Sequence, residues 1–401
     1  MVSHDVAVVG GGCVGLSTAW RLAERGHDVC VIEKEIHLAE HQSGRNSGVL
    51  HPGFNYPPDS LKADFATEGT RRMKEYCEDR DVAVDECGVV VVAQDQEERD
   101  RLDDLASQAD ANGVETEIVD ADRLADLEPA ADGIAALWAP EAASVDSPQY
   151  VHRLARDAER AGATLYLGHR VTGVDVATSV GADHVLHTNA GDVAADYVVN
   201  AAGLHADTVA RPFGVGDDVR VVPFRGEYYE MLPDAADAVN GMIYPTPDPE
   251  LPFLGVHYTR RTDGKVIVGP NAVLAFGREA YRNTQIDLRD LLGTLTYPGF
   301  LRLMASRKML AVAWSELNKS YRKRAFVAAA RRLVPDVDGA DFAKSYAGIR
   351  AQLVSRDGAL VKDPVFEHGD RSTHVLNAVS PGLTCSLPFG EHLADAVEER
   401  L

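Results

Sequence analysis

A glycine cluster near the start of the chain has the spacing of a phosphate-binding turn. Gly10, Gly12 and Gly15 form a G-x-G-x-x-G motif between an apolar segment and a helical one. Gly10 would permit a tight turn, Gly12 a close approach to a pyrophosphate, and Gly15 close packing of helix on strand. Glu33 follows about 20 residues on, where a carboxylate binds ribose hydroxyls and disfavours the 2′-phosphate of NADP. The motif therefore predicts a site for the ADP half of a dinucleotide.

Two further segments favour FAD over NAD as that dinucleotide. In the loop 42–53, small polar residues could follow the pyrophosphate and ribityl chain and bring His51 to the ring system. The segment 377–384 has the pattern of a strand, a turn and a helix start, which could direct N–H groups at a flavin carbonyl. Taken alone, each segment could also be a plain surface loop.

Several longer motifs resemble those of a known enzyme family. These are the glycine motif, Glu33-Lys34, 41–53, 60–62, 222–228, 243–245, 252–257, 268–276 and 347–352. They are similar to the FAD-dependent L-2-hydroxyglutarate dehydrogenases and oxidases, within the D-amino-acid oxidase and glycerol-3-phosphate dehydrogenase superfamily. The resemblance spans nearly the full chain. The chain departs from this family at two places. Arg45 stands where well-known members carry His, and the tail reads Ser-Pro-Gly-Leu-Thr where they have Ser-Pro-Ala-Ala-Thr. Both departures lie on the flavin side.

The motif and the resemblance together imply a set of FAD-binding residues. They are Gly10, Gly12, Gly15, Glu33, Lys34, Ser43, Arg45, Asn46, Ser47, Gly48, Ser380, Pro381, Gly382, Leu383 and Thr384. Val171 stands where the superfamily holds the adenine with a strand backbone, and Ala202 and Gly203 end a strand near the pyrophosphate. Ordinary strand packing is the alternative explanation for these last three residues.

The resemblance implies oxidation of L-2-hydroxyglutarate to 2-oxoglutarate. This reaction removes the hydroxyl proton and passes the C2 hydride to flavin N5, so it needs a base, cations for the carboxylates and a dry pocket. His257 is favoured as the base, because histidine titrates near neutrality, and His51 would polarise or position the substrate. Alternatively, His51 contacts only the edge of the isoalloxazine.

Arg225 and Arg350 are the expected carboxylate clamps, since a guanidinium matches a carboxylate with two hydrogen bonds. An internal ion pair between Arg225 and Glu227 is the alternative. Further hydrogen bonds to the distal carboxylate are expected from Tyr56, Tyr244 and Asn271.

Rival functions remain open at this point. Another flavin enzyme of this fold could oxidise an amino acid, glycerol 3-phosphate, malate or a different hydroxy acid. A non-enzymatic FAD-containing structural or sensor protein is a further alternative. Two carboxylate-binding arginines favour a dicarboxylate over glycerol phosphate but do not exclude malate. The electron acceptor is expected to be a quinone or oxygen.

The elements that must position these residues fall into two groups. Strands are expected at 5–10, 28–33, 88–93, 165–167, 171–176, 184–188, 197–203, 360–367 and 373–378, with alternating antiparallel strands over 219–268. Helices are expected at 15–25, 61–80, 96–112, 122–128, 148–161 and 388–400, and in pieces over 288–333. This order predicts an α/β fold. A Rossmann-like FAD-binding domain (1–85, 148–218 and 340–401) would carry a discontinuous α+β substrate domain with an antiparallel sheet (86–147 and 219–339), as in D-amino-acid oxidase.

The charge of the chain is strongly acidic and restricts its partners. Of 401 residues, 38 are Asp and 24 Glu against 9 Lys and 31 Arg, for a net charge of −22. An acidic surface poor in lysine suits concentrated salt and predicts a halophilic host, although an ordinary acidic cytosolic enzyme is the alternative. Such a charge argues against nucleic acid as a partner.

The remaining features concern location and metals. No run of about 18 apolar residues occurs, and the chain enters a strand at once, so we expect an intracellular, cytoplasmic protein. The basic segment 288–333 could rest on the inner face of the membrane, or be only a solvated face. The five scattered cysteines predict buried apolar residues and no metal site. The sequence indicates no oligomeric state.

Overall fold

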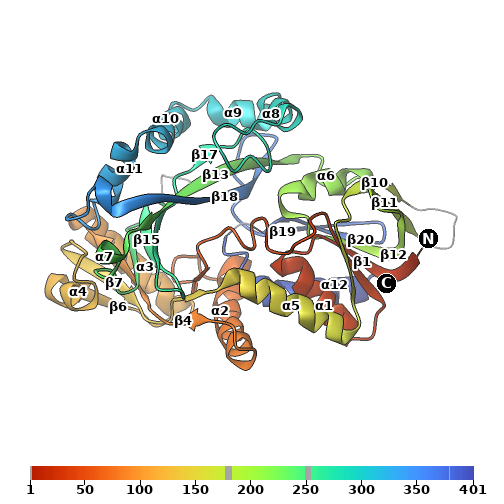
Figure 1. Cartoon of the computed structure of the whole chain (residues 1–401), viewed down its shortest axis with the longest axis horizontal. Coiled ribbons are helices and arrows are strands. Elements are labelled where there is room, and N and C mark those ends of the chain that lie inside the picture. Colours follow the sequence, from red (N-terminus) through yellow and green to blue (C-terminus); the bar gives the residue numbers. More distant parts are fainter. Residues whose placement is uncertain (1, 177–182, 249–253, 379) are drawn as a thin grey trace.

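The first sheet contains the predicted dinucleotide-binding unit. The computed structural model describes residues 2–176, 183–248, 254–378 and 380–401. In it, β1 (Val2–Val9) pairs in parallel with β2 (Val29–Glu33) on one side and with β12 (Val193–Asn200) on the other. The sheet runs in the order β10 (Val171–Val176), β11 (His184–Thr188), β12, β1, β2 and β9 (Thr164–Leu167), with β20 (Ser372–Asn377) and then β19 (Val365–Gly369) beside β12. Figure 1 shows this sheet beside both chain termini.

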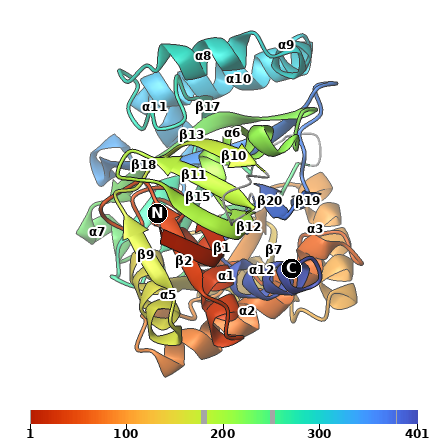
Figure 2. The ribbon, with the colours of Figure 1, turned by 90° about the vertical axis from the view of Figure 1, so that its right-hand side faces the viewer.

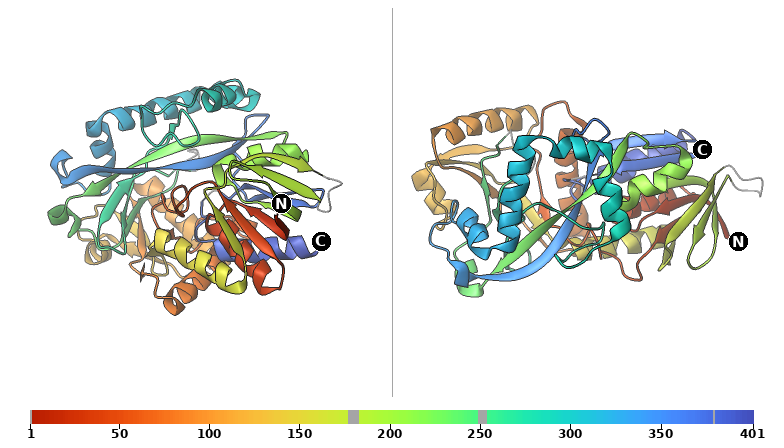
Figure 3. Two further views of the ribbon diagram at one scale, coloured as in Figure 1. Left: turned by 45° about the vertical axis from the view of Figure 1, so that its right-hand side comes forward. Right: turned by 90° about the horizontal axis from the view of Figure 1, so that it is seen from above.

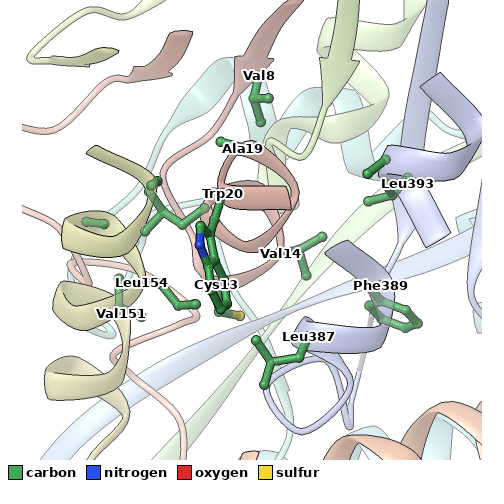
Figure 4. Packing of buried hydrophobic residues seen from close by; sticks show 14 of the residues in the cluster. Val8, Cys13, Val14, Ala19, Trp20, Val151, Leu154, Leu387, Phe389 and Leu393 are labelled. Carbon is green, nitrogen blue, oxygen red and sulfur yellow. The ribbon is translucent and has the colours of Figure 1, made fainter. Parts of the chain in front are cut away.

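Helices α1 (Cys13–Glu24), α5 (Ser147–Ala161), α12 (Ser386–Glu398) and α2 (Leu61–Asp79) pack together against this sheet. Helix α1 is buried along nearly its whole length, and its Trp20 lies between apolar side chains of its neighbours (Figure 4). Helix α5 buries the stripe Tyr150, Leu154 and Ala158, whose spacing places one face of a helix on the core. The helix ends at Gly162, whose φ of +112° suits glycine.

The second sheet is mostly antiparallel. Its order is β17 (Val273–Leu274), β13 (Val219–Met231), β16 (Val266–Gly269), β15 (His257–Arg260), β14 (Met242–Pro245), β5 (Val89–Ala93), β7 (Ala135–Ala139) and β6 (Glu117–Asp120). Strand β18 (Phe342–Ser355) pairs with β13 over nearly its full length. The two long strands lie side by side across the molecule, beneath a layer of helices (Figures 1 and 3).

Smaller elements complete the fold. Helices α3 (Gln96–Ala111) and α4 (Ala121–Leu127) contact β5, β6 and β7, and a short sheet joins β3 (Val49–Leu50), β8 (Ala143–Val145) and β4 (Val84–Asp85). Helices α6 (Ala206–Ala210) and α7 (Pro233–Ala236) are single turns. Helices α8 (Leu288–Leu295), α9 (Pro298–Met304), α10 (Arg307–Tyr321) and α11 (Lys323–Ala330) form the helical layer expected over 288–333. Across the described ranges, no helix has the length and apolar character needed to cross a bilayer.

The structure differs from the predicted elements at the C-terminal third. Strand β18 was not predicted, because its first half is exposed at Ala343 and Lys344 and its second half is buried on both faces, so no alternation marks it. It belongs to the second sheet, whereas the expected boundary at 340 gave it to the FAD-binding domain. The strand expected from 360 begins at Val365. The predicted features at 249–253 and at Val379 lie outside the described residues.

Candidate active site

The glycine turn has a backbone that other residues would disrupt. Gly10 has a φ of +109°, and a Cβ there would lie 2.5 Å from the carbonyl oxygen of Ala201. A Cβ on Gly15 would lie 2.0 Å from the carbonyl oxygen of Gly10. Both distances are far inside van der Waals contact, so the tight turn and the helix–strand contact each require glycine.

A cavity of about 210 Å³ opens at the carboxyl ends of β1, β2 and β12. The predicted cofactor residues that line it are Gly10, Gly12, Glu33, Lys34, Ser43, Val171, Ala202 and Gly203. The Glu33 carboxylate accepts the N–H of Gly11 at 2.8 Å and of Glu35 at 2.9 Å, which holds the acid at the cavity wall. At the start of α1, the Cys13 N–H donates to the Ser43 hydroxyl at 3.0 Å. An acid beside a glycine turn and a helix N-terminus fits the ADP half of FAD.

An ion-pair cluster that the sequence did not indicate stands at the rim of this cavity. The ammonium of Lys34 contacts Glu35 and lies 2.8 Å from the carboxylate of Glu279, which also accepts from His205 at 2.8 Å. The hydrogen bond from His205 and the charge of Lys34 lower the pKa of Glu279 despite its burial. Glu35, His41 and Glu279 have the geometry of a metal site, but the ammonium of Lys34 already contacts all three side chains. The cluster joins the end of β2 to the segment after β17.

The loop 41–53 is fixed between the two sheets. The Asn46 amide donates to the carbonyls of Gln42 and Ser43, and its oxygen accepts the Gly48 N–H at 2.8 Å. From β18, the Tyr346 hydroxyl donates to the Asn46 carbonyl at 2.6 Å. Asn46 therefore shapes the loop and is not among the residues that line the ADP cavity.

The neighbouring loop residues make equally specific contacts. Arg45 places its guanidinium 4.5 Å from the ring centroid of Tyr281, and a Cβ on Gly348 of β18 would lie 2.2 Å from the Arg45 carbonyl oxygen. The Ser47 hydroxyl hydrogen-bonds the Tyr228 phenol. The second sheet thus approaches this loop too closely for a side chain at position 348.

The predicted tail turn meets the loop beside the start of α1. The hydroxyl of Thr384 accepts the backbone N–H of His51 at 3.2 Å and donates to the carbonyl of Val49 at 3.3 Å. The carbonyl of Gly382 lies 3.8 Å from the Cys13 sulfur. The other predicted tail residues, Ser380, Pro381 and Leu383, belong to the same turn before α12. Three chain segments far apart in sequence thereby converge next to the ADP cavity.

His51 lies where this loop reaches the second sheet. Burial, together with the charges of Lys62 and His257, lowers the pKa of His51 to about 3, so its imidazole is neutral at pH 7. Its Nδ1 accepts the N–H of Gly53 at 3.3 Å, which places the remaining proton on Nε2. Its ring centroid is 5.4 Å from that of Tyr56. His51 therefore presents an N–H donor.

His257 begins β15 and is 5% exposed. Its Nδ1 lies 2.9 Å from the carbonyl oxygen of Gly255, and because a carbonyl only accepts, Nδ1 must carry the proton. The Nε2 atom then has a free lone pair. Burial and the charge of Arg350 lower the pKa of His257 to about 4. The ring of Tyr244 packs against it at a centroid distance of 4.3 Å.

Arg350 of β18 is the charge that these side chains share. Its positive charge lowers the pKa of His257. Burial raises the pKa values of Tyr56, Tyr228 and Tyr244, and Arg350 offsets that rise only in part. The three phenols therefore stay protonated and can donate hydrogen bonds. The structure thus brings three of the predicted residues, His257, Tyr56 and Tyr244, under the influence of Arg350, and adds Tyr228.

Lys62 is a second cation of this group that the sequence analysis did not single out. Its ammonium stands 4.8 Å from the ring centroid of Tyr56 and donates to the carbonyl of Lys362 at 3.3 Å. Burial lowers its pKa, and its charge in turn acts on His51. A signal was present in the sequence: Lys62 lies in the first turn of α2, after the N-cap Ser60, where the helix dipole disfavours a cation.

Arg225 lies on the other face of the β13–β18 pair. The register places Arg225 opposite Ile349 and Phe224 opposite Arg350. Because successive side chains of a strand point to opposite faces, Arg225 and Arg350 point away from each other. The expected clamp of two arginines around one substrate is therefore not what the structure shows.

The contacts of Arg225 are internal. Its guanidinium donates to Asn283 and to the carbonyl of Ala280 at 3.2 Å, and its Nε lies 3.6 Å from the carboxylate of Glu227. Asn271 belongs to the same cluster, since its amide donates to Glu227 at 2.9 Å and its oxygen accepts the Glu227 N–H at 2.8 Å. The ion pair that the sequence left open as an alternative is the arrangement found.

The chain is similar over its full length to enzymes of one family. Residues 5–396 match the family of FAD dependent oxidoreductases. The chain is 38% identical to the L-2-hydroxyglutarate dehydrogenase of Indibacter alkaliphilus, over 97% of both chains. It is 36% identical to the mitochondrial human enzyme (99% of this chain, 89% of the relative) and 35% identical to that of Escherichia coli K12 (99% and 94%).

Solved structures share the fold at lower identity. The FAD-bound L-α-glycerophosphate oxidase of Mycoplasma pneumoniae matches with a TM-score of 0.79 at 22% identity, over 99% of this chain and 95% of the other. Glycine oxidase from Geobacillus kaustophilus matches with a TM-score of 0.75 at 23% identity, over 100% and 96%. The predicted combination of a parallel FAD-binding sheet and an antiparallel second sheet is confirmed.

Proposed function

This chain belongs to the family of FAD-dependent oxidoreductases, and we propose that it oxidises L-2-hydroxyglutarate to 2-oxoglutarate. Three full-length relatives at 35–38% identity carry that activity in their names. The observation that carries the proposal is a pair of neighbouring neutral histidines with complementary protons, His51 as donor and His257, under the charge of Arg350, as acceptor. We retain the division into two domains as a proposal, with β18 in the second sheet.

The cofactor is FAD, and the residues present fit it. Gly10, Gly12 and Glu33 would hold the ADP half, and the loop 41–53 with the tail turn would flank the flavin half. Bound FAD supplies the acceptor for the hydride that leaves the C2 atom of the substrate.

We assign the removal of the substrate hydroxyl proton to His257. Its Nε2 lone pair is available at neutral pH, because the lowered pKa of His257 in the protein without substrate keeps the imidazole neutral. A bound dicarboxylate would oppose the effects of burial and of Arg350 and raise that pKa, so that His257 accepts the hydroxyl proton more readily. The Nε2–H of His51 would donate to a substrate oxygen and hold it in place.

We assign the two carboxylates to Arg350 and Lys62, which lie on the side of the β13–β18 pair that faces the loop 41–53. The charge of Arg350 acts on Tyr56 and on Lys62 itself, and the Lys62 ammonium lies 4.8 Å from the ring centroid of Tyr56, so the two cations border the same group of side chains. Phenols that stay protonated can add hydrogen bonds to a carboxylate. Two separated cations would favour a dicarboxylate over glycerol 3-phosphate or an amino acid.

Anaerobic reduction of the bound flavin tests the assignment. We expect L-2-hydroxyglutarate to bleach the yellow enzyme rapidly, and its D isomer and L-malate to do so at least about a hundredfold more slowly in kcat/KM, since a lost charge contact costs several kcal/mol. Reduction only by an amino acid, by malate or by glycerol 3-phosphate would overturn the substrate. A flavin that no compound of these classes reduces would favour a structural or sensor role.

Replacing Lys62 tests the second cation. The variant Lys62→Met should raise KM for L-2-hydroxyglutarate about tenfold or more and change the reduction by the monocarboxylate L-2-hydroxybutyrate little. Lys74→Met, in the same helix and paired with Glu86, is the matched control. Equal losses with both substrates would remove Lys62 from the carboxylate site. For the electron acceptor we propose a quinone or oxygen, which reoxidation rates with each will distinguish.

A further inference from the structure

Residues 278–281, which follow β17 of the second sheet, are fixed against the FAD-binding part of the molecule at both ends. The Arg278 guanidinium donates to the two carboxylate oxygens of Asp207 at 2.6 and 3.0 Å. Asp207 is fully buried on α6, which packs on the first sheet and lies beside β13 (Figure 2). At the other end, the Tyr281 hydroxyl lies 2.6 Å from Nδ1 of His41. A buried, doubly hydrogen-bonded ion pair and a phenol therefore anchor this segment.

Glu279 lies between these two anchors and lines the ADP cavity. The other residues that line this cavity come from within 9–43 and 169–209, so Glu279 is the contribution of the second sheet's side of the molecule. Its Oε1 accepts from Nε2 of His205 at 2.8 Å and lies 2.8 Å from the ammonium of Lys34. Both contacts are made by Oε1, which leaves Oε2 to accept from a ligand in the cavity.

The exposure of Glu279 distinguishes it from an acid that serves only an internal ion pair. Its side chain is 33% exposed, whereas the side chain of Glu227, which pairs with Arg225, is 7% exposed. An acid that faces a cavity from a fixed segment retains a capacity to accept hydrogen bonds that a buried internal pair has used. Glu279 therefore has the character of a ligand-binding residue.

The charge of Glu279 limits what it could bind. The hydrogen bond from His205 and the contact with Lys34 lower the pKa of Glu279, so its carboxylate is ionised at pH 7, only accepts hydrogen bonds and repels phosphates. The donors of the ADP half of FAD are the two ribose hydroxyls and the adenine amino group. Lys34 follows Glu33 directly in the chain, so its contact holds Glu279 beside the acid that the glycine motif assigns to the ribose.

We propose that Glu279 accepts one hydroxyl of the ADP ribose while Glu33 accepts the other, and that residues 278–281 thereby close the cavity over bound FAD. Glu33 ends β2 of the first sheet, whereas residues 278–281 follow the second sheet, so the cofactor joins the two through one ribose. A ligand held by both parts stabilises their association, and that association in turn slows release of the ligand. This retention of FAD is separate from the oxidation of the substrate.

The first test measures release of FAD from the loaded enzyme after dilution, by the fluorescence of the free flavin. Glu279→Gln should release FAD about tenfold faster or more, because the ribose hydroxyl loses a charged acceptor. Glu230→Gln is the matched control and should release FAD as the parent does, since Glu230 on β13 pairs with Lys265, is 34% exposed and lies outside the cavity lining. Tyr281→Phe, which removes the hydrogen bond with His41, should speed release a few-fold. An unchanged rate in Glu279→Gln would overturn the proposal, and an unchanged rate in Tyr281→Phe would overturn closure by the segment.

The second test separates a contact with the ribose from a structural effect. It uses the full chain reconstituted with FAD, with FAD analogues that lack the 2′- or the 3′-hydroxyl of the ADP ribose, or with FMN. In the parent, each analogue should bind about tenfold more weakly than FAD. In Glu279→Gln, one of the two analogues should lose that disadvantage, because the missing hydroxyl no longer has an acid to contact.

Two outcomes of the second test would contradict the proposal. If both analogues keep their disadvantage in Glu279→Gln, Glu279 contacts no ribose hydroxyl. FMN lacks the ADP half, so weaker binding of FMN by Glu279→Gln than by the parent would show that the substitution disturbs the fold and not the ribose contact. None of these readouts depends on the substrate.

Discussion

The two faces of the β13–β18 pair carry the same residue types and use them differently. On one face, the charge of Arg350 acts on His257 and on the phenols of Tyr56, Tyr228 and Tyr244. On the other, Arg225 is 3% exposed and lies against Glu227, Asn271 and Asn283. An arginine held by an acid and two amides within the protein has little left to offer a ligand, and the two faces therefore differ in what surrounds their arginine.

The first prediction concerns the Arg350 face, where the largest effect is expected. Arg350→Met should lower kcat/KM for flavin reduction by L-2-hydroxyglutarate on the order of 10²–10³-fold, because a buried carboxylate loses its partner. The flavin spectrum should be retained. Stopped-flow reduction measures the effect, with Arg356→Met just beyond the end of β18 as the control. A loss of less than threefold would remove Arg350 from the substrate site.

The second prediction separates the two histidines of that face. His257→Gln should lower kcat by about 10²–10⁴-fold, the usual contribution of a general base. His51→Gln, which keeps an N–H donor, should mainly raise KM, by roughly tenfold. Single-turnover reduction at saturating substrate separates the two parameters. The reverse order of effects would make His51 the base.

The third prediction concerns the Arg225 face. Arg225→Met should destabilise the fold by about 3–5 kcal/mol, because it leaves Glu227 buried without its cation. The rate of flavin reduction by the folded variant should be within a few-fold of the rate in the parent. Adding Glu227→Leu should restore part of the stability, which denaturant unfolding measures. A large increase in KM at unchanged stability would return Arg225 to the role of clamp.

The fourth prediction concerns pH and has the smallest effect near neutrality. His257 has its pKa lowered to about 4, so its neutral form persists above that value and kcat/KM should be flat from about pH 5.5 to 8. Below about pH 4 it should fall as the histidine is protonated.

The stability of the fold should also depend on pH through the buried histidines. An unfolded histidine titrates near 6.5, so the unfolded chain binds more protons between about pH 6.5 and 4 and stability falls as pH drops through that window. The acid-side decline, measured relative to each protein at pH 8, should be smaller in His257→Gln than in the parent. Thermal unfolding from pH 8 to 5 measures it, and an equal decline in parent and His257→Gln would contradict the burial of a neutral histidine.

Local pattern sufficed for much of the fold. The β1–α1–β2 unit, helix α2 and helix α5 were predictable because each has its own periodicity, cap or glycine signal, independent of what packs on it. Strand β18 was not, since its pairing with β13 is a contact across more than 100 residues and its own sequence has no alternation. The halophilic host stays a prediction, to be tested by the salt dependence of folding.

The candidate site likewise has one part that the sequence identified and one part that only the tertiary structure decided. Residue type and order by themselves identified the β1–α1–β2 part of the dinucleotide cavity, because Gly10, Gly12 and Glu33 lie within one local unit. Only the tertiary structure decided which arginine could meet a substrate. That choice depends on the parity of the register between β13 and β18, where a shift of one residue would bring Arg225 and Arg350 to the same face. Lys62 likewise became a candidate only when α2 was packed beside the loop that carries His51.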